Sequence, residues 1–300
     1  MSRQQREQVD AAIRARPPGN HESVEQFRAE FRETMANTLV PGGIRTEETK
    51  LGGRRALLVE PAADPGPGTI LYFHGGAFVV GSPETALSPT GNLVTRTGFR
   101  AFSPDYRLAP EDPYPAAADD ALGAYRDLLE QGVDPESIVF AGDSAGGGLS
   151  ITTCLSARDA GLPLPAAVVV FSAWLDLTGT GESIVTRAAA DPMFTPESLA
   201  GPAALYLAGQ DPRQPLLSPA VSADFTGLPP LLLQVGTNEI LLDDSTRAAA
   251  RAREAGVDVI LDVVAGVPHV FPCFTGMLDE ADEALDRAGL FLRQRVSARR

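Results

Sequence analysis

A turn that carries a serine between two glycines constrains this chain more than any other feature. Residues 137–141 form a short apolar run that indicates a buried strand. The next five residues read Gly-Asp-Ser-Ala-Gly, and residues 149–155 are compatible with a helix. A strand that turns sharply into a helix through Gly-x-Ser-x-Gly is a nucleophile elbow. We therefore predict that Ser144 is presented at a helix N-terminus, where developing negative charge is favoured.

The size and charge of the chain limit the classes of protein to which it can belong. Its 300 residues are 44% hydrophobic and 21% charged, as in an ordinary globular protein with ample core. The 39 acidic residues exceed the 25 basic ones and give a net charge of −14, which argues against nucleic acid or an anionic membrane as partner. No apolar stretch is long enough to cross a bilayer, and residues 1–20 show no export signal. We expect a cytoplasmic protein without stable membrane insertion, in which Cys154 and Cys273 are buried free thiols.

From residue 44 onward, strands and helices alternate along the chain. Apolar runs predict strands at 54–60, 69–73, 98–103, 137–141, 166–171, 231–235 and 257–264. Helices are predicted at about 116–131, 243–255 and 278–296. This alternation predicts an α/β fold whose mostly parallel sheet carries helices on both faces. In such a sheet, reactive groups gather at the carboxyl ends of the strands.

The first forty residues are set apart from this alternation. Val24, Phe27, Phe31 and Met35 recur at spacings of three and four, which predicts a helix with one apolar stripe. His21 stands at the start of this segment, where a surface or capping role is expected. The stripe must be buried against something, and both a lid over a site and a plain packing helix satisfy that requirement.

A second glycine-rich motif follows the predicted strand 69–73, where the chain reads His74-Gly75-Gly76. Acyl transfer needs fixed N–H donors aimed at the oxygen that becomes negative. The amides of Gly75 and Gly76, together with that of Ala145, would form such an oxyanion hole. His74 is then expected to brace the loop by hydrogen bonding rather than to act as a base. An ordinary Gly-Gly turn at a strand end is the alternative.

A nucleophilic serine needs a base, and the chain has only three histidines. His21 belongs to the N-terminal segment and His74 to the glycine-rich loop. His269 remains, in a loop between the last predicted strand and the last predicted helix. This position satisfies the chain order serine, acid, histidine. We therefore predict His269 as the base, with an ordinary surface histidine after a proline as the alternative.

The carboxylate that orients this histidine should follow the strand before the histidine strand. Glu239 lies in the turn at the carboxyl end of that predicted strand. Asp243 and Asp244 come at the start of the next helix, where capping and the helix dipole explain acidic residues. Asp176, after the preceding strand, is a further candidate. Either carboxylate type can fill the role, and we choose Glu239 while Asp243 and Asp176 stay open.

Four motifs together resemble one family. They are His74-Gly75-Gly76-Ala77, Asp105-Tyr106-Arg107-Leu108-Ala109-Pro110-Glu111 with Pro113-Tyr114-Pro115-Ala116, Gly142-Asp143-Ser144-Ala145-Gly146-Gly147, and Pro268-His269-Val270-Phe271. The set is similar to that of the bacterial hormone-sensitive-lipase-like carboxylesterases and spans nearly the whole chain. The resemblance implies a single α/β-hydrolase domain over residues 1–300 with a mostly parallel eight-stranded sheet. It implies a core of about 44–178 and 216–300, and a small helical cap from about 1–40 and 179–215.

The same resemblance implies a serine carboxylesterase that hydrolyses short- to medium-chain acyl esters through an acyl-enzyme on Ser144. Its partner would be a small-molecule ester, with no cofactor and no metal, and many members of the family are homodimers. A lactone hydrolase, an amidase or a lyase with the same residues stays open. A non-catalytic receptor for a small apolar ligand is a further alternative, although every candidate for the triad is present.

Two positions depart from the family pattern. Ala77 replaces the usual third glycine of the oxyanion motif, so that its methyl group narrows the hole. Glu239 stands where the family has the aspartate of an Asp-Pro-Leu motif. Both changes keep the required chemical group, because a backbone N–H and a carboxylate survive.

Position alone suggests which side chains form an apolar substrate pocket. One aromatic residue follows the glycine-rich loop, another follows the strand 166–171, and three apolar side chains lie in the 179–215 insertion. The predicted pocket residues are Phe78, Trp174, Met193, Phe194 and Tyr206. Ordinary core packing is the alternative for each of them.

Overall fold

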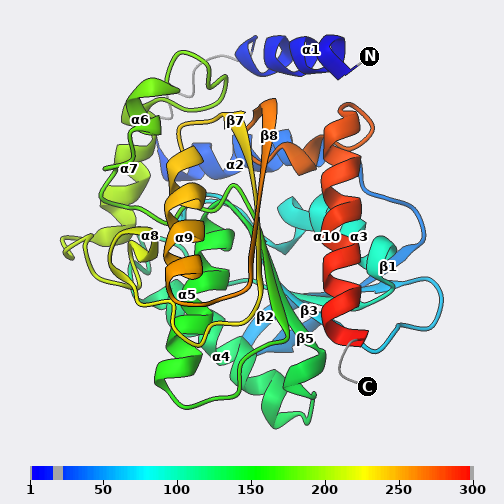
Figure 1. The fold of residues 1–300 in the computed structure, drawn as a ribbon. Coiled ribbons are helices and arrows are strands. Elements are labelled where there is room, and N and C mark those ends of the chain that lie inside the picture. Colours follow the sequence, from blue (N-terminus) through cyan, green and yellow to red (C-terminus); the bar gives the residue numbers. More distant parts are fainter. Residues whose placement is uncertain (1, 16–22, 298–300) are drawn as a thin grey trace.

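An eight-stranded sheet runs through the molecule and positions all other elements (Figure 1). The structure is a computed structural model that describes residues 2–15 and 23–297, so the prediction for His21 lies outside the described residues. The strands are β1 (Ile44–Leu51), β2 (Arg54–Pro61), β3 (Thr69–Phe73), β4 (Arg100–Pro104), β5 (Ile138–Asp143), β6 (Ala167–Phe171), β7 (Leu231–Asn238) and β8 (Val259–Pro268). In space they follow the order β1-β2-β4-β3-β5-β6-β7-β8.

The sheet is mostly parallel, as predicted. Every neighbouring pair from β4 to β8 is parallel, whereas β2 is antiparallel to both β1 and β4. The chain therefore crosses over through helices, which brings the carboxyl ends of the strands to one edge. Reactive residues that follow β3, β5, β7 and β8 can then meet, although they lie far apart in the sequence.

The sequence did not predict β1. Its residues read Ile-Arg-Thr-Glu-Glu-Thr-Lys-Leu and are mostly exposed, so no apolar run marks the strand. β1 pairs with β2 in a hairpin in which Leu51 faces Arg54. The two residues between them, Gly52 and Gly53, both have positive φ, as the tightest hairpin turns require. The Gly-Gly pair was the available signal for this hairpin.

Helices cover both faces of the sheet. α4 (Ala116–Glu130), α5 (Ala145–Asp159) and α9 (Leu242–Glu254) pack on one face, and α3 (Leu87–Thr97) and α10 (Asp279–Ser297) on the other (Figure 1). Alternate residues of a strand point to opposite faces. In β5, Phe140 accordingly joins the core under α4 and α5, while Val139 joins the core under α10. Cys154 and Cys273 are free and buried, as predicted.

The remaining helices lie outside these two layers. The longer ones are α1 (Ser2–Arg14), α2 (Val24–Ala36) and α7 (Pro196–Leu207), and the short elements are α6 (Ser183–Thr186), α8 (Pro219–Ser222), η1 (Pro83–Ala86), η2 (Pro135–Ser137) and η3 (Phe271–Phe274). Figure 1 shows α2, α6 and α7 toward the same end of the molecule. α6 and α7 belong to the insertion between β6 and β7 that we predicted as part of a cap. Within the described residues, no helix combines the length and apolarity needed to span a membrane.

Candidate active site

The candidate nucleophile lies at the junction of β5 and α5, where the sequence predicted it. Ser144 has φ 51° and ψ −120°, a left-handed backbone that a serine rarely adopts. The flanking glycines are sterically required. A Cβ on Gly142 would lie 2.4 Å from the Gly146 carbonyl oxygen, and one on Gly146 would lie 1.9 Å from the Phe73 oxygen. The turn therefore holds Ser144 at the N-terminus of α5, as in a nucleophile elbow.

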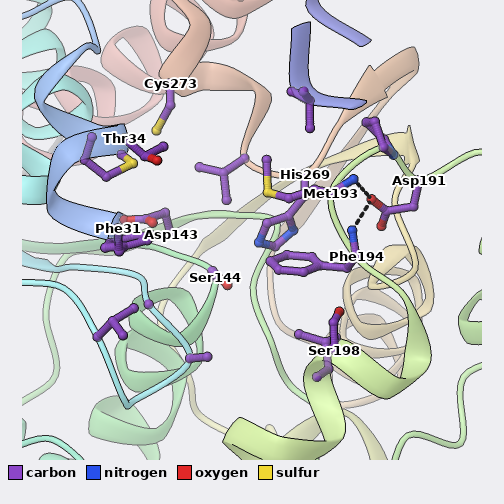
Figure 2. A pocket seen from close by; sticks show the side chains of 18 of the residues that line it. Phe31, Thr34, Asp143, Ser144, Asp191, Met193, Phe194, Ser198, His269 and Cys273 are labelled. Carbon is purple, nitrogen blue, oxygen red and sulfur yellow. Dashed lines mark hydrogen bonds between the residues drawn. The ribbon is translucent and has the colours of Figure 1, made fainter. Parts of the chain in front are cut away.

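The candidate base and acid form a buried pair. Nδ1 of His269 lies 2.8 Å from Oε2 of Glu239, and the two side chains are 3% and 0% exposed. The carboxylate accepts the Nδ1 proton, which leaves Nε2 as the ring nitrogen available for proton transfer. Nε2 has no hydrogen-bond partner among the described residues. His269 and Ser144 line the same pocket, and Figure 2 shows both facing it.

Two further groups fix the orientation of the Glu239 carboxylate. Its second oxygen, Oε1, accepts the backbone N–H of Gly236 at 2.6 Å and the hydroxyl of Ser172 at 2.8 Å. The Ser172 oxygen in turn accepts the N–H of Val270 at 2.9 Å. One hydroxyl thus joins the acid to the residue that follows the histidine. Ser172 was not predicted from the sequence, where its only signal is its place at the carboxyl end of the Val-rich strand.

The alternative acids are engaged elsewhere. Asp176 accepts the amides of Thr178 at 2.8 Å and Thr180 at 3.0 Å. Asp243 accepts the amide of Ser183 at 2.9 Å. Both carboxylates therefore organise the start of the insertion between β6 and β7. Of the three candidates, the described contacts bring only Glu239 to His269.

The glycine-rich loop after β3 borders the pocket with two residues, Gly76 and Ala77. Gly76 has φ 122°, and a Cβ there would lie 2.1 Å from the Val80 oxygen, so that only glycine fits. Gly75 lies against the buried carboxylate of Asp143, the residue before the serine, because a Cβ there would be 2.1 Å from Asp143 Oδ2. Gly75 does not border the pocket, so its place in the oxyanion hole stays a prediction from the sequence.

His74 braces this loop, as expected. Its Nδ1 lies 2.8 Å from the Gly75 oxygen, and its ring stacks on Tyr106 with centroids 4.1 Å apart. The Tyr106 hydroxyl donates to the His74 carbonyl oxygen at 2.7 Å. Burial lowers the pKa of His74 to about 4, so the ring is neutral near pH 7. A neutral ring N–H that donates to a backbone carbonyl is a structural contact.

A pocket of about 670 Å³ opens over Ser144 and His269. Helix α2 lines one side with Phe27, Phe31 and Met35, three residues of the predicted apolar stripe. The insertion lines the other side with Met193 and Phe194, both predicted pocket residues (Figure 2). The stripe is therefore turned toward the pocket, which agrees with the lid alternative for this helix.

The other three predicted pocket residues do not line this pocket. Phe78 stacks on Tyr206 with ring centroids 3.9 Å apart, and Trp174 lies 6.2 Å from Phe78. All three side chains are buried. This aromatic cluster packs the insertion against the core, so for these positions core packing is the better interpretation.

Positive φ recurs at residues other than glycine around the site. It occurs at Ala77 and Phe78 (53° and 63°), Ser144 (51°), Ser172 (49°) and Val270 (49°), in the region that disfavours residues other than glycine. Such conformations persist only where the surrounding structure holds them, and they concentrate at functional sites. They mark the ends of β3, β5, β6 and β8 as one strained cluster.

Comparisons with known proteins agree with this geometry. Residues 70–273 match a protein family described as alpha/beta hydrolase fold. An acetyl-hydrolase of Streptomyces hygroscopicus is 42% identical over 262 residues, which cover 87% of this chain and 86% of that protein. An esterase of Acinetobacter venetianus is 36% identical over 244 residues, covering 81% of this chain and 77% of its own. A crystal structure of an esterase from the bacterial hormone-sensitive lipase family superposes with a TM-score of 0.93 at 40% identity, covering 98% of each chain.

The chain belongs to the α/β-hydrolase fold family, since the matched residues span most of its length. Within that fold it belongs to the bacterial hormone-sensitive-lipase-like esterases, a family of carboxylic ester hydrolases, as the sequence motifs had indicated.

Proposed function

We propose that this protein is a serine carboxylesterase that hydrolyses short- to medium-chain acyl esters through an acyl-enzyme on Ser144. One observation carries the proposal. The buried Glu239–His269 pair, joined at 2.8 Å, leaves Nε2 of the histidine unpartnered in the pocket that Ser144 also lines. A serine, an oriented imidazole and a carboxylate in this order are the components of nucleophilic acyl transfer.

The proposed reaction has two steps. His269 takes the proton of Ser144 as Oγ attacks the ester carbonyl, and it then gives that proton to the leaving alcohol. In the second step His269 deprotonates a water molecule as it attacks the acyl-enzyme carbonyl, and it returns that proton to Ser144 Oγ as the ester bond breaks and the acid leaves. Throughout, Glu239 keeps the imidazole in the tautomer with the proton on Nδ1 and stabilises the imidazolium that forms.

For the oxyanion hole we propose the amides of Gly76, Ala77 and Ala145. Gly76 and Ala77 border the pocket, and Ala145 begins α5 directly after the nucleophile. Compared with the expectation from the sequence, Ala77 takes the place of Gly75. Two or three fixed N–H groups at such a point are worth several kcal/mol in the transition state, because removing one donor costs roughly 3–4 kcal/mol.

The pocket supports the substrate class. Its volume of about 670 Å³ falls within the range of small-molecule sites, and its walls from α2 and the insertion are largely apolar. An acyl chain would bury its methylene groups there, at roughly 0.8 kcal/mol for each CH₂ group. Phe31 and Phe194 lie on opposite sides of this pocket in Figure 2 and would contact such a chain.

Hydrolysis of p-nitrophenyl butyrate by wild type and by Ser144→Ala tests the proposal. We expect the variant to lose at least about 10⁴-fold in kcat, because the nucleophile is absent. A fluorophosphonate probe should label the wild type and not the variant. Equal rates for the two proteins, or an unlabelled wild type, would contradict the proposal and favour a non-catalytic receptor. A panel of esters, lactones and anilides would separate an esterase from the lactone hydrolase and amidase alternatives.

We also propose that the chain divides into a core of 44–178 and 216–300 and a cap of 1–40 and 179–215.

We further propose a homodimer that forms by pairing of β8. This edge strand exposes Ile260, Leu261 and Val263 by 50%, 37% and 42%. An exposed apolar edge strand readily pairs with a second copy of itself. Ile260→Lys should then shift the mass measured by light scattering toward one chain. The cytoplasmic location stays a prediction from the sequence.

A further inference from the structure

Asp191 is a buried carboxylate that neither the motifs nor the proposed mechanism explains. It lies in the insertion between α6 and α7, is 4% exposed and borders the pocket. Oδ1 accepts the amides of Met193 at 2.7 Å and Phe194 at 2.9 Å (Figure 2). Oδ2 accepts the amide of Ile240 at 2.8 Å. Burial raises the pKa of Asp191, so the three amides compensate only part of the cost of burying this carboxylate.

The two oxygens of Asp191 hold two different parts of the site. Oδ1 fixes the backbone of Phe194, whose ring meets the His269 ring edge-on with centroids 4.9 Å apart (Figure 2). Oδ2 fixes Ile240, the residue directly after the proposed acid Glu239. One side chain therefore contacts both the segment that touches the histidine and the loop that carries the proposed acid.

The insertion also provides the hydrogen-bond partner for the second backbone polar group of Ile240, its carbonyl. The carbonyl oxygen of Ile240 accepts the hydroxyl of Ser183 at 2.7 Å. Ile240 is fully buried, so its N–H and C=O cannot be satisfied by water. Both groups are instead satisfied by side chains of the insertion, Asp191 and Ser183. The loop that carries Glu239 thus takes its position from the insertion as well as from the sheet.

We propose that Asp191 is a positioning residue that couples the insertion to the catalytic groups: it holds Phe194 against His269 and Ile240 beside Glu239, and so keeps the imidazole in line with Ser144. The inference rests on the proposed triad and adds to it. It assigns the insertion a part in the chemical step, in addition to its part in forming the pocket wall.

The variant Asp191→Asn tests this role with little change in size. An asparagine has one acceptor oxygen and one NH₂ group, so in either orientation an N–H donor faces another donor. One of the two links is therefore lost. We expect kcat for p-nitrophenyl acetate to fall by about 10- to 100-fold, as misplacement of a catalytic group by a fraction of an ångström can cause. KM should change by less than about threefold, because the small acetyl group makes few contacts with the wall.

Asp176→Asn is the matched control. Asp176 is 2% exposed, accepts two backbone amides and forms an ion pair with Arg247 at 3.3 Å, and no described contact joins it to Glu239 or His269. It should lower the melting temperature to a similar degree and leave kcat within about twofold of wild type. An equal fall of kcat in both variants at equal loss of stability would overturn the inference, because any buried carboxylate would then have the same effect.

Two readouts separate positioning from general stability. In a double-mutant cycle, Asp191→Asn and Phe194→Ala should together lower kcat by less than the product of their separate effects, since both act on the same contact with His269. The downfield proton resonance of the His269 Nδ1–H bond to Glu239 should shift or broaden in Asp191→Asn and stay unchanged in Asp176→Asn. Additive effects together with an unchanged resonance would overturn the inference.

Ser183→Ala keeps the inference testable if Asp191→Asn does not fold. It removes the hydroxyl that donates to the Ile240 carbonyl and that also accepts the Asp243 amide at 3.0 Å, and we expect kcat to fall by about 3- to 10-fold. A kcat equal to that of wild type would contradict the coupling. A wild-type protein without esterase activity would contradict the proposed function instead, and the resonance comparison would still test how Asp191 acts on the Glu239–His269 pair.

Discussion

Among the described residues, two histidines are buried at the carboxyl ends of strands, and we assign them different roles. His74 follows β3 and is 0% exposed, and His269 follows β8 and is 2% exposed. In each, Nε2 has no partner among the described residues. Nδ1 of His74 meets a backbone carbonyl, whereas Nδ1 of His269 meets the carboxylate of Glu239. A carboxylate partner and an open pocket, and not burial alone, therefore distinguish a candidate base from a structural histidine.

The largest expected effect comes from removing the candidate base. His269→Ala should lower kcat/KM for p-nitrophenyl butyrate by about 10⁵- to 10⁶-fold, because the proton of Ser144 then has no acceptor. His74→Asn keeps an N–H donor for the Gly75 carbonyl and should lose less than about tenfold. Steady-state kinetics on both variants measure the contrast. A loss of similar size in the two variants would contradict the different roles assigned to His269 and His74.

The second-largest loss of activity is expected from changing Glu239, the carboxylate that His269 has as a partner and His74 lacks. Glu239→Gln keeps the size of the side chain, but it removes the charge that stabilises the imidazolium and can fix the wrong tautomer. We expect kcat to fall by about 10³- to 10⁴-fold, with KM nearly unchanged. Asp243→Asn and Asp176→Asn serve as controls on the two rejected acids, and a larger loss in either would move the acid assignment to that residue.

A smaller effect is expected from Ser172, which joins the acid to the histidine loop. Ser172→Ala should lower kcat by about tenfold, because the carboxylate loses one of the two donors on Oε1. Ser172→Gly removes the same hydroxyl but suits the left-handed backbone at φ 49°. The two variants should therefore share the loss of activity, while the glycine variant unfolds at higher urea concentration. If the glycine variant keeps full activity, the hydroxyl has no role.

His74 has the smallest expected effect on activity, and its main effect is on the pH dependence of the free energy of unfolding. Burial lowers its pKa from 6.5 to about 4, so the folded chain binds a proton more weakly than the unfolded chain. Its contribution to stability is fully present above pH 6.5 and is lost as the pH falls toward 4. The free energy of unfolding should drop by at most about 3 kcal/mol over this window. Urea titrations of wild type and His74→Asn at pH 7 and 4.5 isolate this part, and an equal pH dependence in both would contradict it.

Much of this site could be predicted because its residues follow local rules. The elbow needs glycines where a Cβ would clash with neighbouring backbone oxygens, and Gly142 and Gly146 indicate this turn in the sequence. The parallel sheet brings the residues after β7 and β8 to the edge where β5 ends, so His269 and Glu239 could be chosen by position. The apolar runs that marked the strands are buried on both faces and therefore stand out.

The residues that could not be predicted make contacts with residues distant in the sequence, which no local sequence pattern indicates. Ser172 and Asp191 are single polar residues whose partners lie 98 and 49 positions away in the sequence, at Val270 and Ile240. Phe78 follows directly after the pocket-lining Ala77, yet it points into the aromatic cluster with Tyr206. Which side of a loop a residue faces is decided by tertiary packing, and the sequence pattern cannot show it.

The residues with positive φ that follow four of the strands affect how the protein loses activity on heating. Ala77, Ser144, Ser172 and Val270 each hold a conformation that costs about 1–3 kcal/mol and that only intact neighbouring loops can enforce. Warming loosens loops before it disrupts a buried parallel sheet. We therefore expect turnover to disappear several degrees below the temperature at which the circular dichroism of the helices changes, so that a catalytically silent but still folded form precedes unfolding.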